Sequence, residues 1–123
     1  MANPTTFTGR IAPHVEHEFV LAQSARARGD DAAEFAHLER AHIIGQESTC
    51  WHVKAHWRML VWGWRCRQPR EVLGQLLRIA GAATMTAIGL VPQGNSGGAN
   101  VSPFRVMPIA PELSEIIRKA KGL

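Results

Sequence analysis

The stretch "LERAHIIGQESTCWHVKAH", residues 38–56, contains the end of one predicted helix and the start of the next. Gly45 closes a run of helix-forming and apolar residues, and glycine commonly follows the last turn of a helix. Ser48 or Thr49 comes soon after, and both are favoured residue types at a helix start. Because so short a connection places consecutive helices side by side, the stretch predicts an antiparallel pair of helices.

Further helices are predicted on both sides of this pair. Proline near the first helical position and glycine after the last turn mark most of their boundaries. The expected helices cover about residues 13–28, 31–44, 49–67, 69–89 and 111–121. Strand signals are nearly absent, so we expect an all-α fold, a small antiparallel bundle of four to five helices.

The length of the chain and the positions of these helices predict the domain organisation. A chain of 123 residues fits one domain, which we place at residues 13–123 after an N-terminal extension, residues 1–12. A long loop rich in glycine, residues 92–108, precedes the last helix, and we hypothesise that it covers the helical site as a lid. The composition, 46% hydrophobic and 20% charged, is typical of globular proteins.

Three features of the sequence predict a cytoplasmic protein without a membrane partner. The N-terminus "MANPTTFTGR" lacks the basic and then apolar pattern of a signal peptide, and two cysteines do not make a disulfide framework. The longest apolar run, residues 79–91, would span about 20 Å as a helix, which is too short for a bilayer core of about 30 Å.

Charge is distributed unevenly along the chain. Residues 1–50 hold seven acidic residues and four Lys/Arg, a net charge of −3, whereas residues 51–123 hold three and ten, a net charge of +7. This pattern fits an acidic half packed against a basic half, or a basic surface for nucleic acid. No run of Lys/Arg is dense enough for a nucleic-acid arm, so we disfavour that partner. Trp62 falls off the main apolar stripe of its helix and marks a candidate surface for homo-oligomers.

Five polar side chains fall on or beside helix faces that are expected to be buried. Each helical residue turns about 100° from the last, and this rotation selects the five from the other charged groups. They are Glu18, Glu39, His42, His52 and His56. Burying an unpaired carboxylate costs several kcal/mol, so a buried glutamate requires a positive partner or a metal ion.

The spacing of these residues favours a metal site between helices. His52 and His56 stand four residues apart, and Glu39 and His42 form a Glu-x-x-His pair, so each pair shares one helix face. With Glu18 on a neighbouring helix, the pair resembles half of the carboxylate di-metal site of ferritin-like bundles, although no second Glu-x-x-His follows. Nitrogen and oxygen ligands together favour one or two transition-metal ions, with Zn or Fe first, over Ca or Mg.

Two functions remain open from the residues alone. The first is a small helical metal-binding protein, either a metal-dependent enzyme or a metal-handling protein. The alternative is a metal-free helical interaction module in which the same glutamates and histidines form a hydrogen-bonded network. The sequence contains no H-E-x-x-H or C-x-x-C, so no catalytic motif names a reaction.

Three blocks of the chain resemble a known family. These blocks are "LERAHIIGQ", "HVKAHWRML" and "GLVPQGNSGGANVSPFRVMPIAPEL". Together they resemble a family of small bacterial proteins catalogued as domain of unknown function 3703, over roughly residues 13 to 115. The resemblance implies a coherent fold of about this length. The family carries no assigned activity, so the metal hypothesis depends on the spacing of the residues.

Overall fold

The computed structural model describes residues 3–85, 89, 93–102 and 104–123. Within these residues the chain forms five α-helices and no strand, which confirms the predicted all-α fold. The helices are α1 (Phe7–Ala27), α2 (Asp31–Gly45), α3 (Thr49–Arg65), α4 (Pro69–Met85) and α5 (Pro111–Ala120). None of them is both long and apolar enough to cross a membrane.

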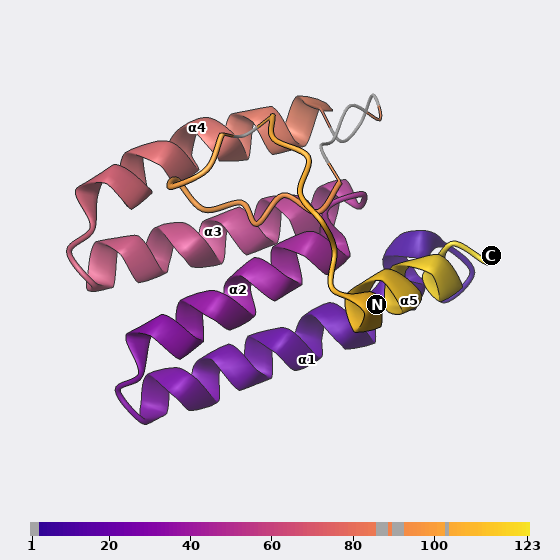
Figure 1. Ribbon diagram of the computed structural model, residues 1–123, viewed down its shortest axis with the longest axis horizontal. Coiled ribbons are helices and arrows are strands. Elements are labelled where there is room, and N and C mark those ends of the chain that lie inside the picture. The colour runs from indigo at the N-terminus through magenta and orange to yellow at the C-terminus, as the bar shows by residue number, and fades with distance from the viewer. Residues whose placement is uncertain (1–2, 86–88, 90–92, 103) are drawn as a thin grey trace.

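The helices form two antiparallel hairpins and a short capping helix. Helices α1 and α2 make one hairpin and α3 and α4 the other, and α2 packs against α3 between them (Figure 1). Helix α5 lies across the start of α1 and the end of α2, where Arg10 Nε donates to the Ala120 carbonyl at 2.6 Å. The hydrophobic core therefore lies between α1, α2, α3 and α5, and its fully buried side chains include Ile11, Val15, Ile44, Met59 and Leu113.

The predicted start of the first helix at Pro13 is wrong. Helix α1 begins at Phe7, and the Thr6 hydroxyl caps it by accepting from the Gly9 backbone N–H at 3.1 Å. Pro13 lies inside the helix, where it removes one backbone hydrogen bond and its ring crowds the carbonyl of the preceding turn. Burial of Ile11 in the core outweighs this loss, so part of the expected extension is helical and packed.

Thr6→Ala is expected to lower the free energy of unfolding by about 1 kcal/mol, because the first turn of α1 loses its cap. Thr6→Ser keeps a hydroxyl at the same place and is expected to stay within a few tenths of a kcal/mol of the parent. Urea unfolding of both variants measures the difference. Equal stability of the alanine and serine variants would show that the cap contributes nothing to α1.

The other helix boundaries are closer to those expected. Asp30 caps α2, and its carboxylate accepts from the Ala33 N–H at 3.0 Å. Helix α3 ends at Arg65, two residues early, since Arg67 takes a positive φ of 56° that a helix cannot continue. Described residues of α4 end at Met85, and the rest of the stretch expected to reach residue 89 lies largely outside the described part.

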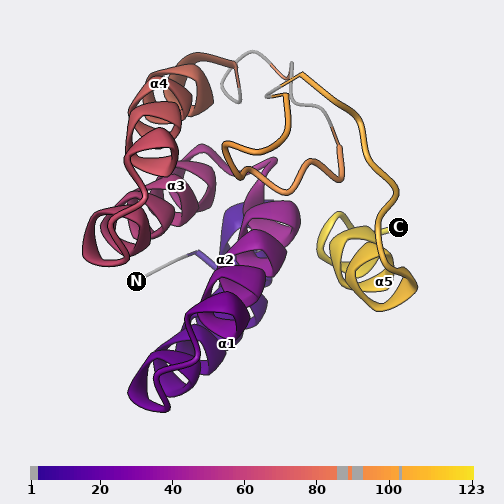
Figure 2. The same ribbon diagram turned by 60° about the vertical axis from the view of Figure 1, so that its left-hand side comes forward.

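The Gly-rich loop returns over the two hairpins before it reaches α5 (Figure 2). Its residues 94–98 are buried, although they form no regular helix or strand. The Asn95 side chain holds the loop together by donating to the carbonyls of Ser102 and Arg105 at 2.8 and 2.7 Å. This part of the loop forms a fixed cover over the facing side chains of α2, α3 and α4.

Candidate metal centre

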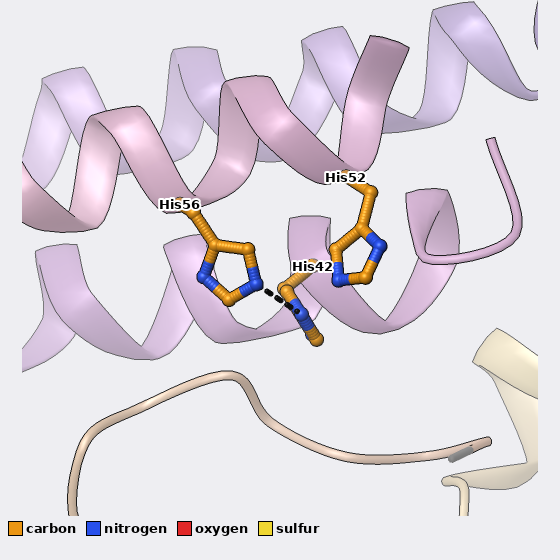
Figure 3. Close-up of side chains that lie close together, drawn as sticks. All are labelled: His42, His52 and His56. Carbon is orange, nitrogen blue, oxygen red and sulfur yellow. Dashed lines mark hydrogen bonds between the residues drawn. The ribbon is translucent and has the colours of Figure 1, made fainter. Parts of the chain in front are cut away.

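Three histidines converge between α2 and α3 under the loop. Figure 3 shows His42 of α2 pointing toward His52 and His56, which lie one turn apart on α3. One ring nitrogen from each lies within 4.8 Å of the others, and the three residues are only 2–6% exposed. The short turn after Gly45 sets the last turn of α2 beside the first turns of α3, so neighbours in sequence become neighbours in space.

Hydrogen bonds fix which nitrogen of His42 carries its proton. Its Nδ1 lies 2.7 Å from the backbone carbonyl oxygen of Asn95. A carbonyl oxygen can only accept, so Nδ1 carries the hydrogen and donates it. In the neutral ring, Nε2 is then left with a lone pair.

The protonated nitrogen of His56 is fixed in the same way by Gln75. The Gln75 amide nitrogen donates to the Gly97 carbonyl at 2.8 Å and to the Glu71 carboxylate at 2.6 Å. These two acceptors orient the amide and leave its oxygen 2.5 Å from His56 Nδ1. The His56 Nδ1 is therefore the donor to that oxygen, and His56 Nε2 also carries a lone pair.

The two unprotonated nitrogens face each other. His42 Nε2 and His56 Nε2 are 3.1 Å apart, as the dashed line in Figure 3 marks. A hydrogen bond at this distance requires one ring to hold a second proton and become an imidazolium. Without that proton, two lone pairs oppose each other at close range, which a cation between them would relieve.

The surroundings oppose the extra proton. Burial and, after it, the neighbouring His56 together lower the pKa of His52 to about 3. Burial likewise lowers the pKa of His56 to about 4, against the Gln75 hydrogen bond, which favours the charged ring. The pKa of His42 lies well below its ordinary value because of burial and of the two histidines beside it. All three rings are therefore neutral at neutral pH and present nitrogen lone pairs.

Two carboxylates lie around this cluster without belonging to it. Glu39, one turn before His42 on α2, is half-buried, and burial raises the pKa of its carboxyl. The nearby Glu71 carboxylate also raises this pKa, whereas a hydrogen bond with Ser96 lowers it. Glu71 itself accepts from the Ala99 backbone N–H at 3.1 Å and from Gln75, so it supports the loop and the amide that orients His56.

Glu18 lies in a different part of the interior from the three histidines. Its carboxylate accepts from Arg40 Nε at 2.9 Å and lies 2.8 Å from His37 Nδ1. The buried glutamate thus has the positive partner that its burial requires, supplied by α2. His37, which was not among the five predicted side chains, reaches Glu18 with its ring at the edge of the α1–α2 contact.

Asn95, Gly97 and Gln75 also belong to the site, although the spacing of residues in the sequence did not indicate them. Gly97 has a φ of +84°, and a Cβ built there would lie 2.6 Å from His42 Cδ2. These contacts place this part of the Gly-rich loop over the three histidines, and its role as a lid stays a hypothesis. The glycines in "GNSGG" were the only sequence signal of this close approach, and nothing in the helical periodicity pointed to Gln75.

These features define an all-α protein whose described residues include a buried cluster of three neutral histidines beneath a glycine-rich loop. Residues 9–117 match the family described as "Protein of unknown function (DUF3703)", and the chain belongs to this family. The family resemblance noted in the sequence is thereby confirmed. No curated protein and no solved structure matches the chain.

Proposed function

We propose that the protein binds a transition-metal ion through His42, His52 and His56. The observation that carries this proposal is the pair of Nε2 lone pairs 3.1 Å apart in a buried space that disfavours a proton. Metal ligands must be unprotonated, and the lowered histidine pKa values meet that requirement at neutral pH. Two ligands bound to one ion at about 2.0–2.1 Å each would have their nitrogens a little over 3 Å apart, which fits this pair.

The donors favour zinc or iron. Imidazole nitrogens suit Zn, Fe, Ni and Cu(II), whereas Ca and Mg prefer oxygen ligands. Metal-bound histidines commonly donate their second N–H to a carbonyl or carboxylate, which fixes the ring. The Asn95 carbonyl and the Gln75 amide oxygen provide this support for His42 and His56. We propose Zn²⁺ as the first candidate and Fe²⁺ as the second.

Three protein ligands leave room for a fourth in a tetrahedral site. In zinc enzymes that position holds water, whose pKa the metal lowers toward 7. Glu39 lies one turn from His42 and its raised pKa suits a group that exchanges a proton, so we propose it as the partner of that fourth ligand. Glu18, held by Arg40 and His37, is proposed as a structural residue and is left out of the ligand set.

Metal analysis of the untagged protein tests the proposal. We expect about one Zn or Fe per chain by mass spectrometry after purification without added metal. His52→Asn and His56→Asn are expected to weaken Zn²⁺ binding at least 100-fold, about as much as the largest losses known for supporting residues. Competition with a chromogenic chelator measures this loss, and circular dichroism checks that each variant folds.

His17→Asn is the matched control, because it removes an exposed imidazole from α1 and leaves the cluster intact. It is expected to bind Zn²⁺ like the parent protein. Substoichiometric metal in the parent, together with a melting temperature that neither Zn²⁺ nor a chelator changes, would reject the proposal. That result would favour the alternative, a metal-free interaction module whose histidines form a hydrogen-bonded network.

A further inference from the structure

The hairpin of α3 and α4 exposes a continuous apolar face. Six large side chains on it are between 37% and 77% exposed, an unusual set for two adjacent helices. They are Trp57, Val61, Trp64, Leu73, Leu76 and Leu77. We call this set the outer face of the hairpin. On each helix its members recur at intervals of three and four residues, which is the spacing of a helix-packing stripe.

The two stripes belong to one surface. Trp64 of α3 and Leu73 of α4 line the same groove beside the turn between the helices. The opposite flank of α4 is covered by the loop, where Arg78 donates to the Val101 carbonyl at 2.6 Å. Among the described helices α4 contacts only α3, and in both overall views no other helix lies beyond it (Figures 1 and 2). The outer face therefore has no partner within the chain's described residues.

The size of the outer face matches that of a protein interface. The exposed parts of its six side chains amount to roughly 700 Å², which exceeds the largest apolar patch of most monomers at about 300–600 Å². A standard interface buries about 800 Å² on each partner. The six side chains include two tryptophans and three leucines and none is charged. This composition is typical of the central part of such an interface.

The charges of the hairpin are placed around this face. Residues 49–85 hold six Lys/Arg and one acidic residue, a net charge of +5. Four of the six basic side chains contact residues outside the outer face: Lys54 contacts Trp51, Arg58 contacts Phe19, Arg65 contacts Glu34, and Arg78 contacts the loop. Arg67 and Arg70 remain, both exposed and both at the turn that joins α3 to α4.

We infer that the outer face binds the same face of a second copy, so that two hairpins form an intermolecular four-helix bundle. A second copy supplies a complementary apolar surface of equal area through a two-fold axis. The hairpins pair antiparallel, because this places the two turns about 25 Å apart, beyond the screening length of about 10 Å. A parallel pair would bring the four arginines of the two turns together. Trp62 takes no part, since its ring stacks on Phe35 and its Nε1 donates to the Asp31 carbonyl.

The molar mass in solution tests this inference independently of metal binding. Sedimentation equilibrium of the full chain is expected to give twice the 13.5 kDa of one copy at micromolar concentrations. Leu77→Glu is expected to raise the dissociation constant of the dimer at least 100-fold, because it places a charge at the apolar centre of the contact. Leu77 is 77% exposed in one copy, so circular dichroism is expected to show an unchanged fold.

Val20→Glu is the matched control. Val20 is an exposed apolar residue of α1, outside the outer face, and its variant is expected to stay dimeric. A parent protein that stays monomeric at high concentration, including one that instead binds an acidic protein or anionic vesicles, would overturn the inference. Equal dissociation in the Leu77→Glu and Val20→Glu variants would overturn it as well.

Disulfide trapping tests the antiparallel arrangement. With Cys50 and Cys66 changed to serine, Arg70→Cys at the turn and Thr84→Cys near the other end of α4 supply the two probes. An equimolar mixture of the two variants is expected to form the mixed disulfide under mild oxidation. Efficient cross-linking of the Arg70→Cys variant with itself would instead show that the hairpins do not pair antiparallel.

Discussion

Lowering the pH from about 7 to about 4 is expected to unfold the metal-free protein, because its three clustered histidines stay neutral in the fold. Burial holds the pKa of His52 at about 3 and that of His56 at about 4, whereas the unfolded side chains take up protons near 6.5. Between these values the unfolded state binds more protons, so stability falls as the pH falls. Each histidine contributes a slope of up to about 1.4 kcal/mol per pH unit.

The expected loss of unfolding free energy between about pH 7 and pH 4 is on the order of 10 kcal/mol, which is comparable to the total stability of a small domain. Urea unfolding between about pH 7 and pH 5 isolates the histidines, since unfolded carboxyl groups titrate near pH 4. His52→Gln is expected to reduce the slope of the unfolding free energy against pH by close to that of one proton, about 1.4 kcal/mol per pH unit. A flat profile in this window would contradict a buried neutral cluster.

Bound Zn²⁺ is expected to shift the acid transition to lower pH. The ion would occupy the lone pairs that protons otherwise take, and its binding free energy adds to the stability of the folded state alone. The shift is expected to grow with the concentration of free Zn²⁺. A transition that stays at the same pH with and without Zn²⁺ would contradict binding at the histidines.

Gly97→Ala is expected to lower the free energy of unfolding by about 2–4 kcal/mol and to weaken metal binding. Alanine is strained at the φ of +84°, and its Cβ would lie 2.6 Å from the buried His42 ring. Either the ring or the loop must then move. Both movements disturb the site, because Asn95 beside this glycine fixes His42 and the Gly97 carbonyl accepts from Gln75.

Gly29→Ala separates the effect of backbone strain at positive φ from the effect of the contact with His42. Gly29 has a similar φ of +74°, yet a Cβ built there meets nothing within 4 Å. This variant shares the backbone strain and is expected to cost only about 1 kcal/mol. Urea unfolding of both variants, with a Zn²⁺ titration of each, measures the difference. Equal losses in stability would show that the contact with His42 contributes nothing.

The spacing of residues in the sequence correctly predicted features that depend on residues close together in the chain. The start of α3 at Ser48–Thr49 and the grouping of His52 with His56 each depend on residues within about one turn of each other. His42 joined that group because the turn after Gly45 is short enough to fix how α2 meets α3. These predictions required no knowledge of distant contacts.

Long-range contacts decided what the sequence could not predict. Glu18 was expected beside the histidines because it is buried, but burial alone does not name a partner. Arg40 and His37 reach Glu18 from α2 because α1 and α2 pack against each other with these side chains on facing sides. In the same way, a proline within a helix looks like a helix start unless the burial of Ile11 before it is known.

Because the Gly-rich loop follows the three histidines in the sequence, the histidines are synthesised before the residues that cover them. The chain is synthesised from its N-terminus, so His42, His52 and His56 are made before Asn95 and Gly97, which cover them. Until the ribosome has added this loop, the three imidazoles have no lid and are open to the surrounding solution. On the proposed function, a metal ion would therefore reach the three histidines most easily before the loop has packed over them.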